Sequence, residues 1–465
     1  MAGHDKDSPR SSEGHAAAGD HGPHAHGHAH DHDHAHSHGL HADPDQIHFN
    51  EAGHAYIRHS YLEPRPFASR SSIRPQPLSD LPPNLAEHFG RIVARNEKAF
   101  AEPFVGVTTD GTVVPELFHL GTTGITLQPV VDAARAFLGT LSPAERQQAS
   151  FPVDSVEWRK WSNAHANHFR HGVCMHYMSE DQRRAALDLL AATTSASGYQ
   201  AMRDVMRLNE HVLELTGRPD EYGEWHYFVS IFGEPSTEKP WGWQLDGHHL
   251  IVNCMMFGDQ MVMTPTFLGS EPCFAESGKF KGLRVLEAEE SLGHALMSAL
   301  SAEQRAQAMI GDVLPKQMFA VAPWDNRIIE HLGIPFDALD ADQKDRLYAL
   351  IETYTGRMRP GHAEIEFETV KRHLDQTKFA WIGRCDDTSP FYYRVHSPVI
   401  LIEFDHQDGV AFVGEEPSRS HIHTVIRTPN GNDYGRDLLR QHYRQYEHTD
   451  AGRHRPRDAE ETADD

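Results

Sequence analysis

Cysteines are few in this chain, and none of them form a CxxC pair. Four cysteines stand at irregular intervals among 465 residues, which is too sparse for a disulfide framework. We therefore expect reduced thiols, as in a cytoplasmic protein. The first residues contain neither the apolar core of a signal peptide nor a twin arginine, so no export signal is expected.

Long apolar runs and basic stretches are missing as well. No run of about 18 or more apolar residues is present, so we expect no segment to span a membrane. Lys and Arg number 43 against 67 Asp and Glu, which gives a net charge of -24 with histidine neutral. This charge repels phosphates and no basic stripe offsets it, so binding to nucleic acids or anionic membranes is not expected.

Several familiar catalytic motifs are also absent. The sequence contains no GxSxG, GxGxxG, P-loop or HExxH pattern. GxSxG carries a nucleophilic serine and GxGxxG binds a dinucleotide. The P-loop binds nucleotide phosphates, and HExxH binds a zinc ion. Serine hydrolases, dinucleotide-dependent dehydrogenases, nucleoside triphosphatases and zincin proteases are therefore disfavoured.

Histidine, in contrast, is abundant. Ten of the 36 histidines lie between His21 and His41, in HGPHAHGHAHDHDHAHSHGLH. Residues 1–60 contain almost no large apolar side chains, so we expect them to form a disordered tail. Imidazoles at this density favour weak, multi-site binding of free zinc, nickel or copper ions. A disordered segment holds no fixed geometry, so catalysis is expected elsewhere.

The rest of the chain has the composition of a folded protein. We expect a single large domain over residues 61–447, followed by a second disordered tail at 448–465. Helical patterns dominate from about 85–220, and strand patterns dominate at about 224–275 and 378–430. Because the two patterns are segregated, the sequence predicts an α+β fold with a largely antiparallel sheet that carries the His and Glu motifs. The helical portion would pack on this sheet.

Four expected helices begin with the same pattern, the capping box. In this pattern a Ser or Asp side chain and a Glu or Gln three residues later each satisfy a free backbone N–H of the first turn. We interpret these helices as scaffold without a functional role. The pairs are Ser142 and Glu145, Ser179 and Gln182, Ser301 and Gln304, and Asp340 and Gln343.

The segment SHIHTVIRTP contains the first candidate metal ligands. Residues two apart share a strand face, so His421, His423 and Arg427 should point the same way. Two imidazoles in this arrangement can hold one ion from a rigid backbone. In VILIEFD, one loop earlier, Glu403 and Asp405 also share a face, and burying a carboxylate without a partner is costly. We therefore expect the histidines and carboxylates to face each other.

The segment GWQLDGHHLIVN contributes two further histidines. His248 and His249 are adjacent, so in a regular strand they would point to opposite faces and at most one would reach a common site. A bulge after Gly247 would change this. Asp246 is a candidate acceptor that orients one imidazole. The alternative is that both are core histidines bonded to backbone carbonyls.

Two weaker patterns also contain potential metal ligands. The helical spacing in NAHANHFRHGVCMHY, from His165 onward, suggests a second metal site, but a solvated helix face explains it better. Cys254 and Met256 share a strand face and would suit copper, but buried packing explains them better. Asp433 is expected to cap the helix YGRDLLRQHY.

The order of these blocks resembles a known bacterial family. The blocks are IFGEPS, PWGWQLDGHHL and TPTFLGSEP, then FAWIG and FYYRVHSPVILIEFD, then HIHTVIRTPNGNDYGRDLLRQHY. From roughly Phe100 to Tyr446 the chain is similar to the DUF3500 family, whose function is uncharacterised. The resemblance implies a shared fold and site but no reaction. The family's motif residues fall on His248, His249, His421 and His423, with Glu403 and Arg427 alongside.

Our first hypothesis is a metal-dependent enzyme. A divalent ion, zinc before iron or copper, would be held by His421, His423 and one of His248 or His249. Glu403 would be a fourth ligand or the general base. A metal ion held in this way lowers the pKa of bound water, so hydrolysis is favoured over oxidation.

The two arginines near these motifs suggest the kind of substrate. Arg427 and Arg394 would hold an anionic group on a small molecule, because a guanidinium suits carboxylate or phosphate. Two alternatives stay open: a metal-handling protein, either chaperone or storage factor, that uses the His-rich tail, and a non-metal binding module with structural histidines. The sequence leaves the substrate, the identity of the metal and the oligomeric state open.

Overall fold

The structure is a computed structural model of the full chain. Residues 1–39 and 40–465 form two separate units, and all described residues lie in the second. Of the predicted tail at 1–60, only β1 (Ile47–Phe49), β2 (Ala55–Ile57) and Arg58 are described, and the two strands pair antiparallel. The described residues are 47–49, 55–58, 62–66, 70–74, 76–164, 168–448 and 454–456.

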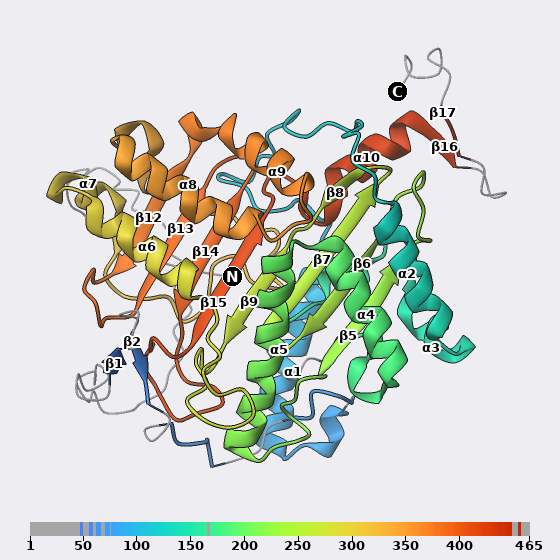
Figure 1. The fold of residues 1–465 in the computed structure, drawn as a ribbon, viewed down its shortest axis with the longest axis horizontal. Helices are drawn as coiled ribbons and strands as arrows, with labels where there is room; N and C mark the ends of the chain where they lie inside the picture. Colours follow the sequence, from blue (N-terminus) through green and yellow to red (C-terminus); the bar gives the residue numbers. More distant parts are fainter. Residues whose placement is uncertain are drawn as a thin grey trace, which may run out of the picture. The chain divides into compact units, whose positions relative to one another are not determined.

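Thirteen strands of the described residues form one mixed sheet. They are β3 (Ser150–Phe151), β4 (Val173–Cys174), β5 (Tyr227–Phe232), β6 (Trp241–Gly247), β7 (Leu250–Phe257), β8 (Gln260–Val262), β9 (Thr266–Ser270), β10 (Met309–Gly311), β11 (Ile334–Pro335), β12 (Lys378–Gly383), β13 (Phe391–His396), β14 (Leu401–His406) and β15 (Ile422–Arg427). The main path is β10-β12-β13-β14-β15-β9-β7-β6-β5-β3, of which the strands from β12 to β5 can be followed in Figure 1. In this sheet only the β10–β12 and β3–β5 pairs are parallel. A short pair, β16 (Tyr446–His448) and β17 (His454–Pro456), lies outside this sheet.

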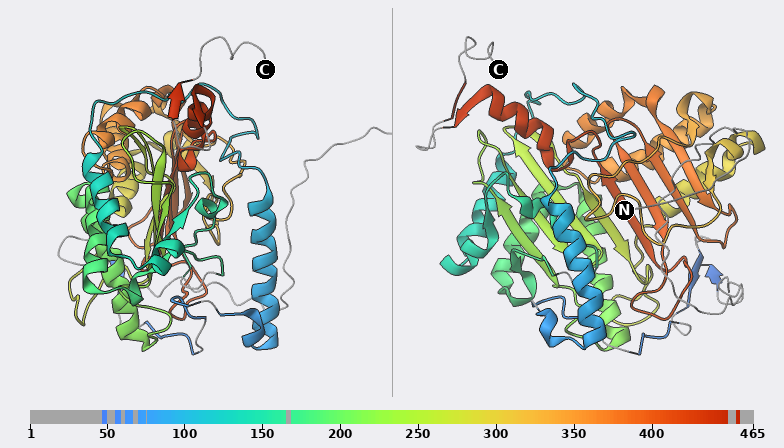
Figure 2. Two further views of the ribbon diagram at one scale, coloured as in Figure 1. Left: turned by 90° about the vertical axis from the view of Figure 1, so that its right-hand side faces the viewer. Right: turned by 180° about the vertical axis from the view of Figure 1, so that it is seen from behind.

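Most helices cover one face of the sheet, whereas α1 lies on the other (Figure 2). The α-helices are α1 (Pro83–Ala101), α2 (Gln128–Thr140), α3 (Pro143–Ala149), α4 (Glu180–Thr193), α5 (Ala196–Thr216), α6 (Glu287–Ala299), α7 (Ala302–Ala308), α8 (Ala341–Thr355), α9 (His362–Lys371) and α10 (Arg436–Gln445). The 3-10 turns are η3 (Leu78–Asp80), η4 (Val156–Arg159), η5 (Met175–Tyr177), η6 (Phe336–Ala338), η7 (Leu374–Gln376) and η8 (Asp433–Gly435). The predicted α+β class with a largely antiparallel sheet is confirmed. No described helix combines the length and the apolar character needed to cross a bilayer.

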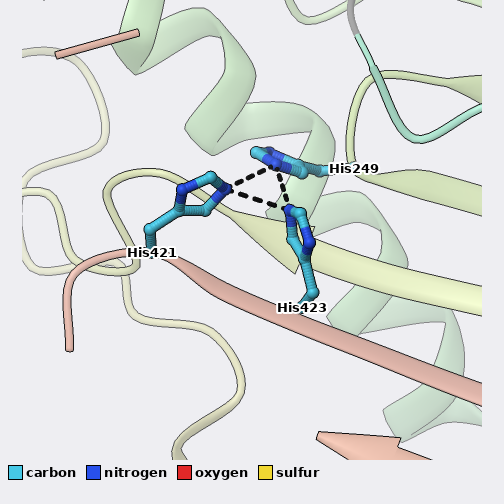
Figure 3. Close-up of side chains that lie close together, drawn as sticks. All are labelled: His249, His421 and His423. Atoms are coloured by element: carbon cyan, nitrogen blue, oxygen red, sulfur yellow. Dashed lines mark hydrogen bonds between the residues drawn. The ribbon is translucent and has the colours of Figure 1, made fainter. Parts of the chain in front are cut away.

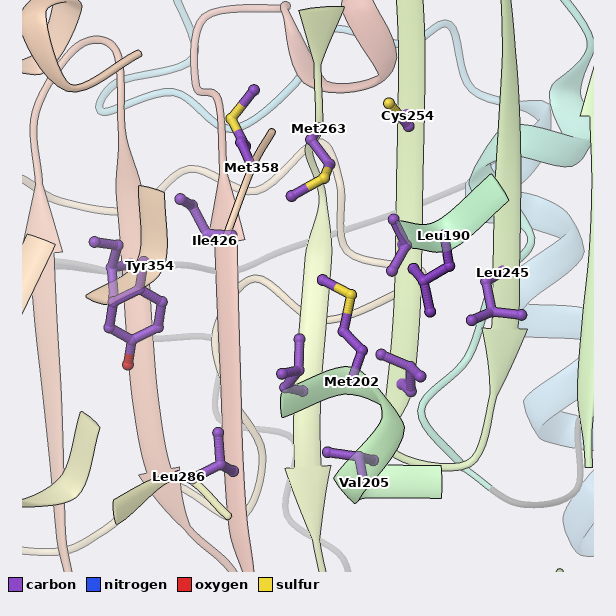
Figure 4. Packing of buried hydrophobic residues seen from close by; sticks show 14 of the residues in the cluster. Leu190, Met202, Val205, Leu245, Cys254, Met263, Leu286, Tyr354, Met358 and Ile426 are labelled. Atoms are coloured by element: carbon purple, nitrogen blue, oxygen red, sulfur yellow. The ribbon is translucent and has the colours of Figure 1, made fainter. Parts of the chain in front are cut away.

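The main hydrophobic core fills the space between the sheet and the helices of the well-covered face. Leu190 and Met202 from the helices belong to the same buried cluster as Leu245 and Ile426 from the strands (Figure 4). Cys254 belongs to this cluster too, which supports packing rather than copper binding as its role. A second cluster, which includes Phe267 and Val425, covers the opposite face. The sheet is therefore buried on both sides, although its second face also carries buried charged side chains such as Glu403 and Arg427.

Strand alternation determines which side chains face the site. In β15, Ile422 and Ile426 point into the main core, whereas Val425 points to the opposite face. His423 and Arg427 therefore share the face of Val425, as the sequence predicts. The same alternation puts Glu403 and Asp405 on that face, because Ile402 and Phe404 of β14 lie in the main core.

The sheet and its helices consist of two similar halves. The first half runs α2, α3, β3, β4, α4, α5, β5, β6, β7, and the second runs α6, α7, β10, β11, α8, α9, β12, β13, β14. In each half the first short strand pairs parallel and the second antiparallel with the strand that opens a meander. Strand β9 completes the first half and β15 completes the second, and these two strands pair antiparallel and join the halves. The domain thus contains two copies of one structural unit.

The four predicted capping boxes are formed, and they occupy equivalent places in the two halves. In the first half, Nε2 of Gln182 donates to Oε2 of Glu145 at 3.2 Å and so joins two boxes. In the second half, Nε2 of Gln343 donates to Oε1 of Gln304 at 2.8 Å. Each of these glutamines also donates to a carbonyl at the end of the preceding long helix. The capping-box pattern therefore recurs in the sequence because the structural unit that contains it occurs twice.

The halves differ at the turn between their second and third meander strands. His248 and His249 form the turn between β6 and β7, whereas the equivalent turn between β13 and β14 contains Pro398 and Val399. His249 adopts a left-handed backbone with φ of 61°. His248 and His249 therefore do not lie within a regular strand, because the strand ends at Gly247 and the chain reverses through them.

Candidate metal site

Three imidazoles, those of His249, His421 and His423, point toward one another (Figure 3). The Nε2 atoms of His249 and His421 lie 3.2 Å apart, those of His249 and His423 lie 3.0 Å apart, and those of His421 and His423 lie 3.0 Å apart. We call these three residues the His triad. All three are buried, with exposed fractions of 5%, 1% and 8% respectively.

The triad is assembled from the two halves of the domain. His249 comes from the β6–β7 turn of the first half, and its backbone N–H donates to the carbonyl of Asn163 at 3.1 Å. His423 lies in β15 of the second half, and His421 directly precedes that strand. The carbonyl of His249 also accepts from the N–H of Gly269 in β9 at 2.8 Å. These backbone hydrogen bonds fix the turn against the central strands.

Gly269 provides the space that the imidazoles occupy. It lies opposite His423 in the β9–β15 pair. A Cβ atom at Gly269 would lie 2.9 Å from Cδ2 of His423 and 3.1 Å from Cδ2 of His249, closer than van der Waals contact allows. The triad therefore depends on glycine at this position. Gly269 belongs to none of the sequence motifs, so the sequence alone does not indicate its role.

The spacing of the three nitrogens suits a metal ion. Zinc binds imidazole nitrogen at about 2.0–2.1 Å, so a tetrahedral ion separates two such ligands by about 3.3 Å. The observed separations of 3.0–3.2 Å are close to this value. The three residues present thus fit a divalent ion held by three histidines, with a coordination position left for another ligand.

Hydrogen bonding among the rings alone does not satisfy the triad. A protonated Nε2 donates but has no lone pair with which to accept, and an unprotonated Nε2 only accepts. In a triangle of three such atoms, at least one contact must therefore join two donors or two bare lone pairs. A cation shared by three bare nitrogens removes this conflict.

The protonation state of His423 also favours metal binding. Burial lowers the pKa of His423 well below its ordinary value, and the neighbouring His421 and His249 lower it further. His423 is therefore neutral near pH 7. Neutral imidazole is the form that binds a metal ion.

A cleft of about 780 Å³ opens beside the triad, and all three histidines line it. Its other walls come from α1, from the loop at 316–323 and from the loop that joins β14 to β15. The apolar part of the wall includes Ile92, Met318 and Val321. The charged side chains in the wall are Arg65, Arg95, Lys316, Asp408, Glu415 and Glu416.

His248 and Glu403, two predicted ligands, are not part of the triad. Nδ1 of His248 lies 2.8 Å from Oδ1 of Asn209, and its ring stacks on that of His249 with 3.9 Å between centroids. Glu403 accepts from the N–H groups of Phe319 and Ala320 at 3.1 and 2.8 Å and from the hydroxyl of Tyr392 at 2.7 Å. The structure thus assigns Glu403 a different set of partners, and it anchors the loop at 316–323.

The two predicted anion-binding arginines also have other partners. Arg427 is fully buried and donates to Asp433 at 2.7 Å, and Asp433 accepts from the N–H of Thr428. Arg394 donates to the carbonyl of Glu330 at 3.0 Å. Neither arginine lines the cleft, where Arg95 and Lys316 supply positive charge instead. Asp433 pairs with Arg427 rather than capping α10, whose N-cap is Gly435.

The remaining histidine cluster does not assemble among the described residues. The triad is the one group of three or more potential ligands found there. Nδ1 of His171 lies 3.2 Å from the carbonyl of Phe169, and His165 lies outside the described residues. Asp246, the predicted acceptor for an imidazole, accepts instead from Nε of Arg170 at 3.0 Å and from the N–H of Ser162 at 3.2 Å.

Comparison with known proteins gives a family but no activity. No curated protein and no solved structure matches the chain. A family model described as "Protein of unknown function (DUF3500)" matches residues 123–436, a span that contains the whole His triad and both halves of the sheet. Since this match covers well over half of the chain, the protein belongs to the DUF3500 family.

Proposed function

We propose that this protein is a metal-dependent enzyme that acts on a small molecule in the cleft, with zinc as the favoured metal. The observation that carries the proposal is the convergence of three Nε2 atoms within 3.2 Å in the wall of a 780 Å³ cleft. Three histidines plus an open position are typical of catalytic rather than structural zinc sites. Iron and copper are the alternatives, because imidazole also suits these metals.

Hydrolysis is the favoured reaction. Zinc has no redox chemistry, and as a Lewis acid it would polarise a carbonyl or phosphoryl group and lower the pKa of bound water toward neutrality. The chain's own residues hold the three nitrogens in place, and the buried setting keeps His423 neutral. Oxidation is the second choice, to be considered if the bound metal is copper or iron.

The cleft favours a substrate with an anionic group and a short aliphatic part. Arg95 lines it without a carboxylate partner among the described residues, and Lys316, which interacts electrostatically with Asp408, adds a second positive charge. Burial lowers the pKa of Arg95, as expected for a cation that lacks a counter-charge. The apolar wall formed by Ile92, Met318 and Val321 would contact the aliphatic part.

The test is elemental analysis of protein purified without chelators. We expect one more equivalent of zinc, iron or copper in the parent chain than in a variant with His421→Ala and His423→Ala. The comparison is then repeated after deletion of residues 1–60, so that ions held by the His-rich tail do not obscure the difference. Equal metal content in parent and variant would refute the proposal and leave a non-metal binding module with structural histidines.

A second candidate function is metal handling, either delivery or storage. The observation in its favour is the ten histidines between His21 and His41, which would gather ions for the folded part. Deletion of the tail separates the two functions. Turnover by an enzyme would persist at ample metal without the tail, whereas a chaperone would lose delivery. Either function agrees with a cytoplasmic location, which we infer from the sparse cysteines.

A further inference from the structure

Glu271 supports the metal site although it does not belong to the triad. It directly follows β9, two residues after Gly269, and it is buried. Its two carboxylate oxygens accept from three successive backbone N–H groups of the loop that joins β14 to β15. These distances are 3.0 Å to each oxygen from Val410, 2.8 Å from Ala411 and 3.4 Å from Phe412.

The same loop supplies the hydrogen-bond partner of one triad histidine. Nδ1 of His421 lies 2.6 Å from the carbonyl oxygen of Asp408, so Nδ1 carries the proton and donates it. Nε2 of His421 is then bare and faces His249 and His423. The carbonyl of Asp408 thus selects the tautomer of His421 that can bind an ion.

The position of that carbonyl depends on what holds the loop. Glu271 fixes residues 410–412 from the sheet side. Arg65 holds the outer side, where its guanidinium donates to the carbonyl of Gly409 at 2.6 Å. Oε2 of Glu271 also lies 3.7 Å from Nδ1 of His421, so its negative charge favours a partial positive charge on that ring.

We infer that Glu271 is a positioning residue of the metal site: through the loop at 408–412 it fixes the tautomer and ring orientation of His421 and raises the affinity for the ion. This inference rests on the proposed function, because it concerns the same site. Outer partners of metal-bound histidines orient the ring and raise its basicity, and their loss costs about ten- to a hundredfold in metal affinity.

Two changes test the inference from opposite sides of the contact. Glu271→Gln keeps the size of the side chain but removes its charge and presents an N–H to backbone donors. Val410→Pro keeps Glu271 and removes the backbone N–H that contacts both of its oxygens, and Val410→Ala is the matched control that keeps this N–H. The side chain of Val410 is 49% exposed, so these changes at 410 do not open the core. Glu289→Gln controls for the loss of a buried carboxylate elsewhere, since Glu289, on α6, pairs with Arg357.

The readouts are affinity and coordination in the full chain, not activity. Zinc is titrated against a competing chelator, and the transition that disappears in His421→Ala is assigned to the triad. Cobalt is then used as a probe, because its visible d–d bands distinguish a tetrahedral site from ions bound in other geometries. We expect Glu271→Gln and Val410→Pro to weaken this transition by about ten- to a hundredfold and to change the cobalt spectrum. Val410→Ala and Glu289→Gln should leave both unchanged.

The outcomes separate the two proposals. If the parent shows no transition that depends on His421, the proposed function fails and this inference falls with it. If the parent shows the transition but Glu271→Gln and Val410→Pro retain its affinity, only this inference is overturned. An equal loss in Glu289→Gln would also overturn it, because the effect would then be general destabilisation. If Glu271→Gln does not fold, the pair at position 410 decides.

Discussion

The Nε2 atoms of His249 and His423 lie 3.0 Å apart although 174 residues separate them in the chain. One belongs to a tight turn of the first half of the domain and the other to a central strand of the second half. Three buried Nε2 atoms within 3.2 Å of one another cannot all be satisfied by hydrogen bonds among themselves, because at least one pair must join two donors or two acceptors. Five predictions, four on this site and its cleft and one on a buried histidine elsewhere in the fold, add to the experiments above.

His249 and His248 should behave differently although they are neighbours. His249→Ala removes one of three ligands and should abolish stoichiometric zinc at the triad. His248→Ala should keep that zinc, because His248 lies outside the triad and contacts Asn209. Metal content after exhaustive dialysis measures both. Loss of zinc from His248→Ala alone would mean that the wrong histidine has been assigned.

Gly269→Ala should weaken the metal site. The added methyl group would lie 2.9 Å from the ring of His423 and 2.8 Å from the carbonyl oxygen of Ile422, and the backbone there cannot move freely. We expect a loss of about 1–3 kcal/mol in stability, together with lower zinc affinity. Gly139→Ala in α2 is the control, since nothing lies within 4 Å of the added atom. That control should be neutral or more stable by up to about 1 kcal/mol.

Glu403→Gln should destabilise the fold without emptying the metal site. The substitution disturbs hydrogen bonds to the N–H groups of Phe319 and Ala320, with an expected cost of about 1–3 kcal/mol in the free energy of unfolding. Chemical denaturation measures this cost, and elemental analysis measures the metal. If zinc is lost while the fold remains stable, Glu403 acts as a ligand after all, as the sequence suggests.

Arg95→Met should weaken the binding of an aliphatic carboxylate such as hexanoate, but not of the neutral hexanamide. We expect roughly a fivefold loss, equivalent to about 1 kcal/mol, for a charge contact at a partly exposed site. Calorimetric titration of the full chain measures both ligands. The matched control is Arg91→Met, one turn earlier on α1, where Arg91 pairs with Glu87 and does not line the cleft. Equal binding of hexanoate by parent and Arg95→Met would remove the basis for an anionic substrate.

Acid should destabilise the protein through its buried neutral histidines. Burial, and secondly the charge of His176, lowers the pKa of His226 from 6.5 to about 4, and its Nδ1 lies 2.7 Å from Oγ of Ser72. In the unfolded chain this group takes up a proton below about pH 6.5, whereas the folded protein resists until about pH 4. Stability is therefore complete above pH 6.5 and falls as the pH decreases through this window, by roughly 3 kcal/mol for this residue.

The check is thermal unfolding of the parent and of His226→Gln at about pH 7.5 and about pH 5. The variant should lose less stability than the parent between these two values, even if it is less stable at both. A constant difference between the two proteins at both pH values would show that His226 does not titrate as described.

Local patterns in the sequence predict those parts of the site that depend on periodicity. Alternation along β15 predicts that His423 and Arg427 share a face, and the structure agrees. The capping boxes predict four helix starts, each of which is formed. These features depend only on residues a few positions apart, so a single segment contains the information.

Features that depend on distant partners were beyond such patterns. Glu403 faces the predicted side of the sheet, but the N–H groups that bind it come from residues 83 and 84 positions earlier. Whether His248 or His249 reaches the site depends on the left-handed backbone at His249. The residues that usually indicate such a turn, glycine and asparagine, are not present at that position. The hydrogen-bond partner of His421 is a backbone carbonyl, and since every residue has one, the sequence does not identify it.

The place of the triad at the junction of the two halves has a mechanical consequence. One ligand comes from the first copy of the repeated unit and two come from the second, beside the place where β9 and β15 pair. An ion bound by all three histidines would cross-link one copy to the other. The two copies should then unfold together when the ion is bound, and their unfolding should become less cooperative when the ion is removed. The metal ligands would thus stabilise the fold in addition to any role in catalysis.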